Sequence, residues 1–296
     1  MHTKWSVLSL ATAVFTVSAT TAAPTVEKQT HGLTVHFDAG VLRLEVWSDR
    51  AMRVTFAQGA ALPSTRSLSV ISTPSAAPFR IEETTESVNL STAVLEARID
   101  KSTALVTFTD SGGNIILRET GTREPALAAN FTLGPDEQIY GLGQHQGGQM
   151  SYRGTSVHLQ QKNMEIGIPM LFSSRGYGLF WDNPAITDVQ VGVKGQEGVL
   201  RWNSETGRVI DYYFLYGPKA EDVVAAYRKL TGPAPLMPKW LWGFWQCKER
   251  YSTQAEMLGI VTRYRRQHMP LDGIVQDWQY WKPGGWGSAT NASAST

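Results

Sequence analysis

The chain has 296 residues, of which 42% are hydrophobic and 18% are charged, so it can bury a substantial core and is not a disordered protein. Its 27 basic and 26 acidic residues leave a net charge of +1. Because no basic stripe could neutralise a run of phosphates, the charge pattern argues against a nucleic-acid partner.

Residues 1–23 are predicted to be a signal peptide. Lys4 supplies the positive start, residues 5–19 are mostly apolar, and small residues lead to Pro24. This apolar run is short and interrupted by Ser and Thr, so no stable membrane insertion is expected. The mature protein is therefore expected to be secreted and extracellular, or periplasmic in a bacterial host.

Residues 24–232 are predicted to form an N-terminal β-sandwich domain. Short alternating apolar runs separated by Gly, Asp, Asn and Ser are typical of strands in such a fold. Residues 110–113 are predicted to form a hairpin turn before a strand at 115–117. Apolar residues at helical spacing in 220–230, ending at Gly232, predict one helix that closes the sandwich. Further strands are predicted at 40–47, 53–56, 93–99 and 104–108.

A Pro-rich linker at 233–238 precedes a different pattern at 239–296. We expect a strand over 240–247, a helix capped by Ser252 and running to about Gln267, and a buried strand over 271–275. Strand, helix and strand in this order are typical of a βαβ unit that starts a parallel sheet or barrel. Cys247, the one cysteine, cannot form an intrachain disulfide and is expected to be buried.

Two blocks of sequence resemble glycoside hydrolase family 31. The first is the YGLG turn at 140–143 with the strand GYGLFWDN at 176–183, and the second is PKWLWGFWQCKERY at 238–251 with DWQYW at 277–281. The resemblance covers roughly residues 30–290. It implies a galactose-mutarotase-like β-sandwich followed by the start of a (β/α)8 TIM barrel, a mainly β chain with a short α/β C-terminal part.

The resemblance also implies a function. Family members are retaining α-glycosidases that hydrolyse O-glycosidic bonds of α-linked carbohydrates, and their two catalytic carboxyl groups stand on later barrel strands. A complete barrel takes about 250 residues, so residues 239–296 are an incomplete start that lacks both groups. We therefore expect an α-xylosidase- or α-glucosidase-like parent protein acting on an oligosaccharide or glycoside, while this chain alone is inactive. The DWQYW ending favours xylosides.

A second hypothesis is a non-catalytic carbohydrate-binding β-sandwich protein. No cofactor is expected. A metal site is not expected either, since His145 has no second His or Cys at ligand spacing. The sequence leaves the oligomeric state open.

Five residues are candidates for substrate binding. Asp277 comes after Gln276, just where the last predicted strand stops, and the resemblance implies that the family's Asp at this place accepts hydrogen bonds from hydroxyls of the sugar in the cleavage subsite. Working residues of a barrel stand at the C-terminal ends of strands, although an Asp after a strand is also a common cap or turn residue. Aromatic neighbours could stack on the sugar or simply pack the barrel: Phe244, Trp245, Trp278 and Trp281.

Overall fold

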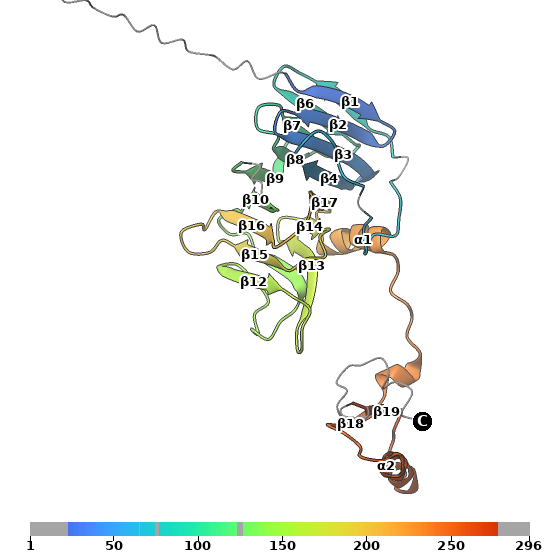
Figure 1. The fold of residues 1–296 in the computed structure, drawn as a ribbon. Helices are drawn as coiled ribbons and strands as arrows, with labels where there is room; N and C mark the ends of the chain where they lie inside the picture. The colour runs from blue at the N-terminus through green and yellow to red at the C-terminus, as the bar shows by residue number, and fades with distance from the viewer. Residues whose placement is uncertain (1–22, 65, 75–76, 123–126, 278–296) are drawn as a thin grey trace, which may run out of the picture. The chain divides into compact units, whose positions relative to one another are not determined.

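The computed structural model describes residues 23–64, 66–74, 77–122 and 127–277, and the chain divides into two units, Met1–Pro233 and Ala234–Thr296 (Figure 1). Among the residues described, no helix is both long enough and apolar enough to cross a membrane. Residues 1–22 of the predicted signal peptide lie outside the described ranges.

The first unit contains an eight-stranded antiparallel sheet. An early strand, Ala51–Ala57, pairs with the last strand of this unit, Ile210–Tyr216, so the two ends of the unit share one sheet. In spatial order the strands are β1 (Thr25–Gln29), β2 (Gly32–Phe37), β3 (Gly40–Ser48), β4 (Ala51–Ala57), β17 (Ile210–Tyr216), β14 (Tyr177–Trp181), β13 (Ile166–Ser173) and β11 (Ile139–Gln144).

A nine-stranded antiparallel sheet forms the other layer. The strand predicted from residue 104 begins two residues later, because Ala104 has φ = 59° in the turn before it. In spatial order the strands are β12 (Thr155–Leu159), β15 (Thr187–Val191), β16 (Val199–Ser204), β10 (Ala128–Thr132), β9 (Ile115–Thr120), β8 (Val106–Asp110), β7 (Leu95–Asp100), β6 (Ser87–Ser91) and β5 (Arg80–Glu83).

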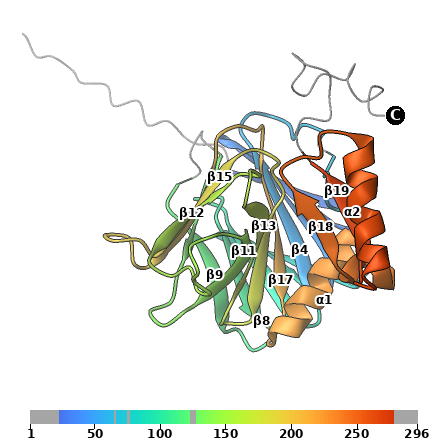
Figure 2. The ribbon, with the colours of Figure 1, turned by 90° about the horizontal axis from the view of Figure 1, so that it is seen from below.

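Aromatic side chains join the two sheets into one core. Phe108 of β8 stacks on Phe214 of β17 with ring centroids 4.0 Å apart, and Trp181 of β14 stacks on Trp202 of β16 at 5.6 Å. The Trp181 indole N–H also donates to Ser204 Oγ at 2.9 Å, so this large side chain is buried with its donor satisfied. The two layers seen in Figure 2 confirm the predicted β-sandwich.

Helix α1 (Ala220–Thr231) packs on the outer face of the eight-stranded sheet and ends at Gly232, as predicted. Val223, Ala226 and Leu230 line its buried face. A Cβ added at Gly178 of β14 would lie 2.6 Å from Val223 Cγ1, so only glycine lets the helix approach this strand. Gly178 of the GYG segment therefore serves helix packing.

The YGLG segment lies in β11, where the pairing with β13 shifts register. Gly143 has φ = 101°, and a Cβ built on it would lie 1.9 Å from Ile166 O. Leu142 between the two glycines takes φ = 62° and is fully buried. This segment is a β-bulge that glycine permits by its small size and its conformational freedom.

The second unit begins with a short helix, η1 (Lys239–Trp242), which is followed by β18 (Trp245–Lys248). The predicted strand over 240–247 is therefore wrong in its first half. Leu241 N donates to Pro238 O at 3.0 Å and Gly243 N donates to Trp240 O at 3.2 Å, so the backbone turns at this point instead of extending.

Helix α2 (Gln254–Arg266) and β19 (Gly273–Gln276) complete a βαβ unit in which β18 and β19 are parallel, as predicted. The helix cap differs from the prediction. Thr253, not Ser252, is the N-cap, because Thr253 Oγ1 accepts the Glu256 backbone N–H at 3.1 Å. The strand starts two residues later than expected and is only half-buried.

Apolar side chains of the second unit are widely exposed. Trp242 is 78% and Leu236 is 99% exposed. Cys247 is also exposed, so its predicted burial is wrong. The physical reason is that β18 has a single neighbouring strand among the described residues and α2 has no buried residue, so this small unit covers few side chains, Tyr251 and Leu271 among them, and leaves Cys247 uncovered.

Candidate functional site

Asp277 stands at the C-terminal edge of the two-stranded parallel sheet. The register pairs Lys248 with Gln276, and Asp277 directly follows Gln276 and is exposed. In (β/α)8 barrels, side chains at this edge form the functional site. Trp278 and Trp281 lie outside the described residues, so their predicted roles in substrate binding are not placed.

Phe244 and Trp245 stand at the other edge of this sheet. Trp245 is the first residue of β18 and Phe244 precedes it, so both lie at the start of this strand and not in the second half of a strand over 240–247, as the prediction had placed them. Four residues at a strand rise of about 3.3 Å separate this edge from Asp277 by about 13 Å. Trp245 packs against Trp240 with centroids 5.6 Å apart, and Phe244 packs against Tyr264 at 5.8 Å. Their role in substrate binding stays a prediction.

Asp272 lies at the same edge of the sheet as Phe244 and Trp245, opposite to the edge with Asp277. Its Oδ2 accepts the Phe244 backbone N–H at 3.1 Å, and the strand residues 273–276 lie between it and Asp277. Two carboxyl groups that cooperate in a retaining glycosidase are about 5 Å apart. Asp272 and Asp277 are therefore not such a pair.

A hydrogen-bond network that sequence reasoning missed surrounds the edge with Asp277. Lys248 Nζ donates to Glu256 Oε1 at 2.6 Å, and Glu256 Oε2 accepts the Ser252 backbone N–H at 2.7 Å. The hydrogen bond from Lys248 lowers the pKa of the Glu256 carboxyl. Gln276 Nε2 donates to Tyr251 O at 3.2 Å. The sequence contained one signal for this network: Glu256 lies three residues after Thr253, which is the spacing of a capping box at the start of a helix.

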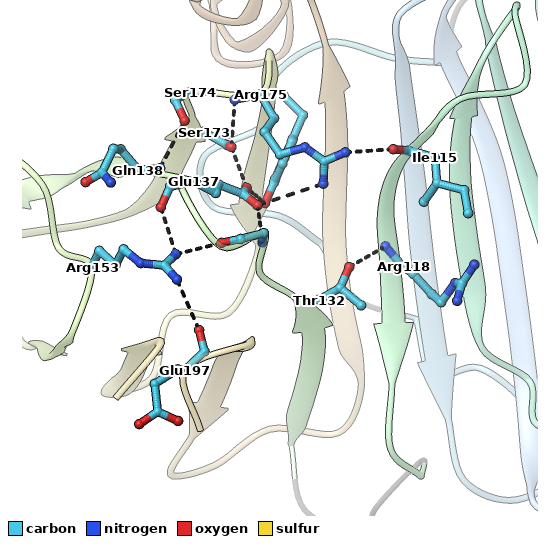
Figure 3. A network of polar contacts seen from close by, with 12 residues as sticks. Ile115, Arg118, Thr132, Glu137, Gln138, Arg153, Ser173, Ser174, Arg175 and Glu197 are labelled. Carbon is cyan, nitrogen blue, oxygen red and sulfur yellow. Dashed lines mark hydrogen bonds and ion pairs between the residues drawn. The ribbon is translucent and has the colours of Figure 1, made fainter. Parts of the chain in front are cut away.

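In the sandwich, Glu137 is a fully buried carboxylate that holds several segments together (Figure 3). It accepts hydrogen bonds from Ser173 Oγ, from Tyr177 OH at 2.6 Å and from the Gly134 backbone N–H at 2.8 Å. Arg175 Nη1 lies 3.9 Å from Glu137 Oε2. Burial and the adjacent Glu137 raise the pKa of Tyr177 well above its usual range. This arrangement stabilises the turn before β11.

His145 is part of the same unit and is held by its neighbours. Its Nε2 lies 2.9 Å from Leu142 O, its Nδ1 lies 3.8 Å from Glu165 Oε2, and the side chain is 12% exposed. Within the described ranges, no group of three or more His, Cys, Asp or Glu side chains could hold a metal ion. The geometry therefore gives His145 a structural role.

A hollow of about 940 Å³ in the sandwich is lined in part by Ser67, Asp182 and Asp211. Asp211 is bound by Arg53 through two hydrogen bonds of 2.8 and 2.6 Å. Ser67 Oγ donates to Asp182 Oδ1 at 2.9 Å, while Asp182 Oδ2 is buried without a hydrogen-bond partner among the described residues. Burial raises the pKa of Asp182, and the nearby charge of Asp211 adds to the effect.

Asp182→Asn is expected to make the sandwich more stable at neutral pH. A carboxyl whose pKa is higher in the folded chain contributes stability below its unfolded pKa of about 4, and this contribution is lost as pH rises through the folded pKa. Asn cannot ionise, so the variant does not lose this stability as pH rises, and its amide oxygen can still accept the hydrogen bond from Ser67. Urea unfolding from pH 4 to 8 should show an advantage of the variant that grows with pH. A difference independent of pH would contradict this account.

Comparisons with known proteins agree with both units. Residues 41–189 match the glycosyl hydrolase 31 N-terminal galactose mutarotase-like domain, and residues 234–294 match the TIM-barrel domain of glycosyl hydrolases family 31. The chain is 36% identical over 263 residues to an α-xylosidase of Saccharolobus solfataricus, covering 83% of this chain and 35% of the relative. It is 26% identical over 271 residues to α-glucosidase 2 of Bacillus thermoamyloliquefaciens, covering 84% and 34%.

Among solved structures, a GH31 α-xylosidase from a soil metagenome in complex with xylose is 25% identical, with a TM-score of 0.78, covering 88% of this chain and 42% of that one. The GH31 α-xylosidase of Xanthomonas citri, 24% identical, has the same fold with a TM-score of 0.78, covering 89% and 46%. The chain thus spans less than half the length of each of these four proteins.

Proposed function

The chain belongs to glycoside hydrolase family 31, and from this premise we propose that it is the N-terminal part of a retaining α-glycosidase whose preferred substrates are α-xylosides. The observation that carries the proposal is the similarity to an α-xylosidase across both units. The exposed carboxylate of Asp277 at the C-terminal edge of β18 and β19 supports it, because barrel enzymes bind their substrates at that edge.

We further propose that Asp277 binds sugar hydroxyls and that the two catalytic carboxyl groups come from barrel strands outside this chain. Residues 239–277 contain four acidic side chains: Glu249, Glu256, Asp272 and Asp277. Glu256 is held by Lys248 and Ser252, and Asp272 lies at the wrong edge. The chain alone is therefore expected to lack hydrolytic activity. We also propose, from the predicted signal peptide, that the complete protein is exported after removal of residues 1–23.

The test starts from the native gene product purified from the culture medium or periplasm. Intact mass should show an N-terminus near residue 24 and several hundred residues beyond Thr296. This protein should hydrolyse an aryl α-xyloside faster than the α-glucoside and release the α-anomer first, because retaining enzymes form a glycosyl-enzyme intermediate. The matched control is the 296-residue chain, which should give no turnover above the blank.

Turnover by the 296-residue chain would contradict the proposed absence of the catalytic pair. A native product that ends at Thr296 and binds saccharides without cleaving them would instead favour the carbohydrate-binding β-sandwich hypothesis. First release of the β-anomer would refute the retaining mechanism.

A further inference from the structure

We propose that Gln276 is a positioning residue for Asp277: its side-chain amide ties the end of β19 to the loop that follows β18 and so sets where the Asp277 carboxylate stands. This inference rests on the proposed sugar-binding role of Asp277. Gln276 Nε2 donates to Tyr251 O at 3.2 Å, which joins two segments 25 residues apart.

The acceptor of this hydrogen bond is held in place by its own surroundings. Tyr251 is only 4% exposed, and Lys248 Nζ lies 5.1 Å from the centroid of its ring. The same Nζ donates to Glu256 Oε1 at 2.6 Å, so the cation spans the loop from the end of β18 to the first turn of α2. The Tyr251 carbonyl is thus a fixed point to which β19 can be anchored.

The loop is also anchored at its far end. Glu256 Oε2 accepts the Ser252 backbone N–H at 2.7 Å, and Thr253 Oγ1 accepts the Glu256 N–H at 3.1 Å. The second hydrogen bond satisfies a free N–H group in the first turn of α2, and the first ties the residue before the N-cap to that turn. Helix, loop and strand end therefore form one connected unit around the position of Asp277.

Asp277 itself lies beyond the last residue pair of the strand ladder, which joins Lys248 to Gln276. Among the residues that the structure describes, the Gln276 amide is therefore a side-chain anchor directly beside Asp277 in the sequence. Substrate-positioning groups are sensitive to small displacements, since a shift of about 1 Å can cost about 100-fold in rate. Loss of the amide should consequently reduce binding of the sugar hydroxyls by Asp277.

The test is a double-mutant cycle in the complete gene product, with kcat/KM for an aryl α-xyloside as the readout. Gln276→Met removes the donor and keeps the length of the side chain, and it should lower kcat/KM by about 10-fold. In the Asp277→Asn background the same change should cost less than about 2-fold, because a residue that acts through Asp277 has nothing left to position.

Gln246→Met provides the matched control. Gln246 lies in the same sheet, its Oε1 accepts the Tyr264 hydroxyl at 2.8 Å and its Nε2 donates to Cys247 O at 3.2 Å, so this variant loses two hydrogen bonds that only support packing. Whatever it costs should be the same in the wild-type and in the Asp277→Asn background, as for a purely structural residue. Gln276→Glu, which keeps the shape and loses the donor, repeats the test if Gln276→Met fails to fold.

An equal loss from Gln276→Met in both backgrounds, or no loss in the wild type, would overturn the inference while leaving the proposed function intact. If Asp277→Asn alone left kcat/KM unchanged, the proposed role of Asp277 would fail first, and the inference with it. A coupling confined to Gln276 and Asp277 supports the positioning role.

Discussion

Asp277→Asn is expected to lower kcat/KM of the complete protein for α-xylosides by about 100- to 1,000-fold. Each hydrogen bond to a charged group contributes about 1.5–3 kcal/mol, and an ionised carboxylate can accept from two sugar hydroxyls. The amide keeps one acceptor oxygen but loses the charge. Steady-state kinetics on the purified variant measures the effect, and the thermal midpoint should stay within about 1 °C because Asp277 is exposed.

Asp272→Asn is the control for this experiment. The side chain has the same chemistry and lies at the opposite edge, where it accepts the Phe244 N–H. Its replacement should affect the stability of the second unit more than the kinetics, with kcat/KM within about 3-fold of wild type. Equal losses from both variants would show that Asp277 acts through the fold and not on the substrate.

Glu137→Ala is expected to destabilise the sandwich by about 3–5 kcal/mol, which is the usual cost of removing one partner from a buried charged network. The variant leaves Ser173 Oγ, Tyr177 OH and Gly134 N without their acceptor. Tyr177 is fully buried, so its hydroxyl loses its acceptor at a place that bulk solvent does not reach.

Urea unfolding of the 296-residue chain, followed by near-ultraviolet circular dichroism, measures this loss. With a slope of about 2 kcal/mol per molar urea, the midpoint should fall by about 1.5–2.5 M. Glu82→Ala is the matched control, since Glu82 is 56% exposed and only pairs with Arg80 at the surface. It should change stability by less than about 0.5 kcal/mol. A similar effect of both variants would exclude a special role for the buried network.

The elements with strong local patterns were predictable from the sequence. The alternating run in β3 and the amphipathic run in α1 carry their periodicity in consecutive residues, and the glycine after α1 marks its end. The position of Asp277 after a strand could be predicted for the same reason, because strand, helix and strand follow one another along the chain.

Local pattern was misleading where neighbours decide the conformation. The run of Trp and Leu after Pro238 is apolar enough for a strand, yet it turns into η1, and this moves Phe244 and Trp245 to the start of β18. Ser252 and Thr253 are both good N-caps by composition, and only the direction of their side chains selects Thr253. Cys247 is exposed because burial depends on covering elements, not on residue type.

The sequence by itself determined the class of the fold, the order of the two units and the family, because periodicity, turn residues and the Gly- and Trp-containing motifs are local features of the chain. The tertiary structure alone decided which polar groups meet. Glu137 reaches Tyr177, Arg53 reaches Asp211 across 158 residues, and Gln276 reaches Tyr251. The physical reason is that sheet pairing and loop anchoring bring distant residues together, and no local spacing encodes that proximity.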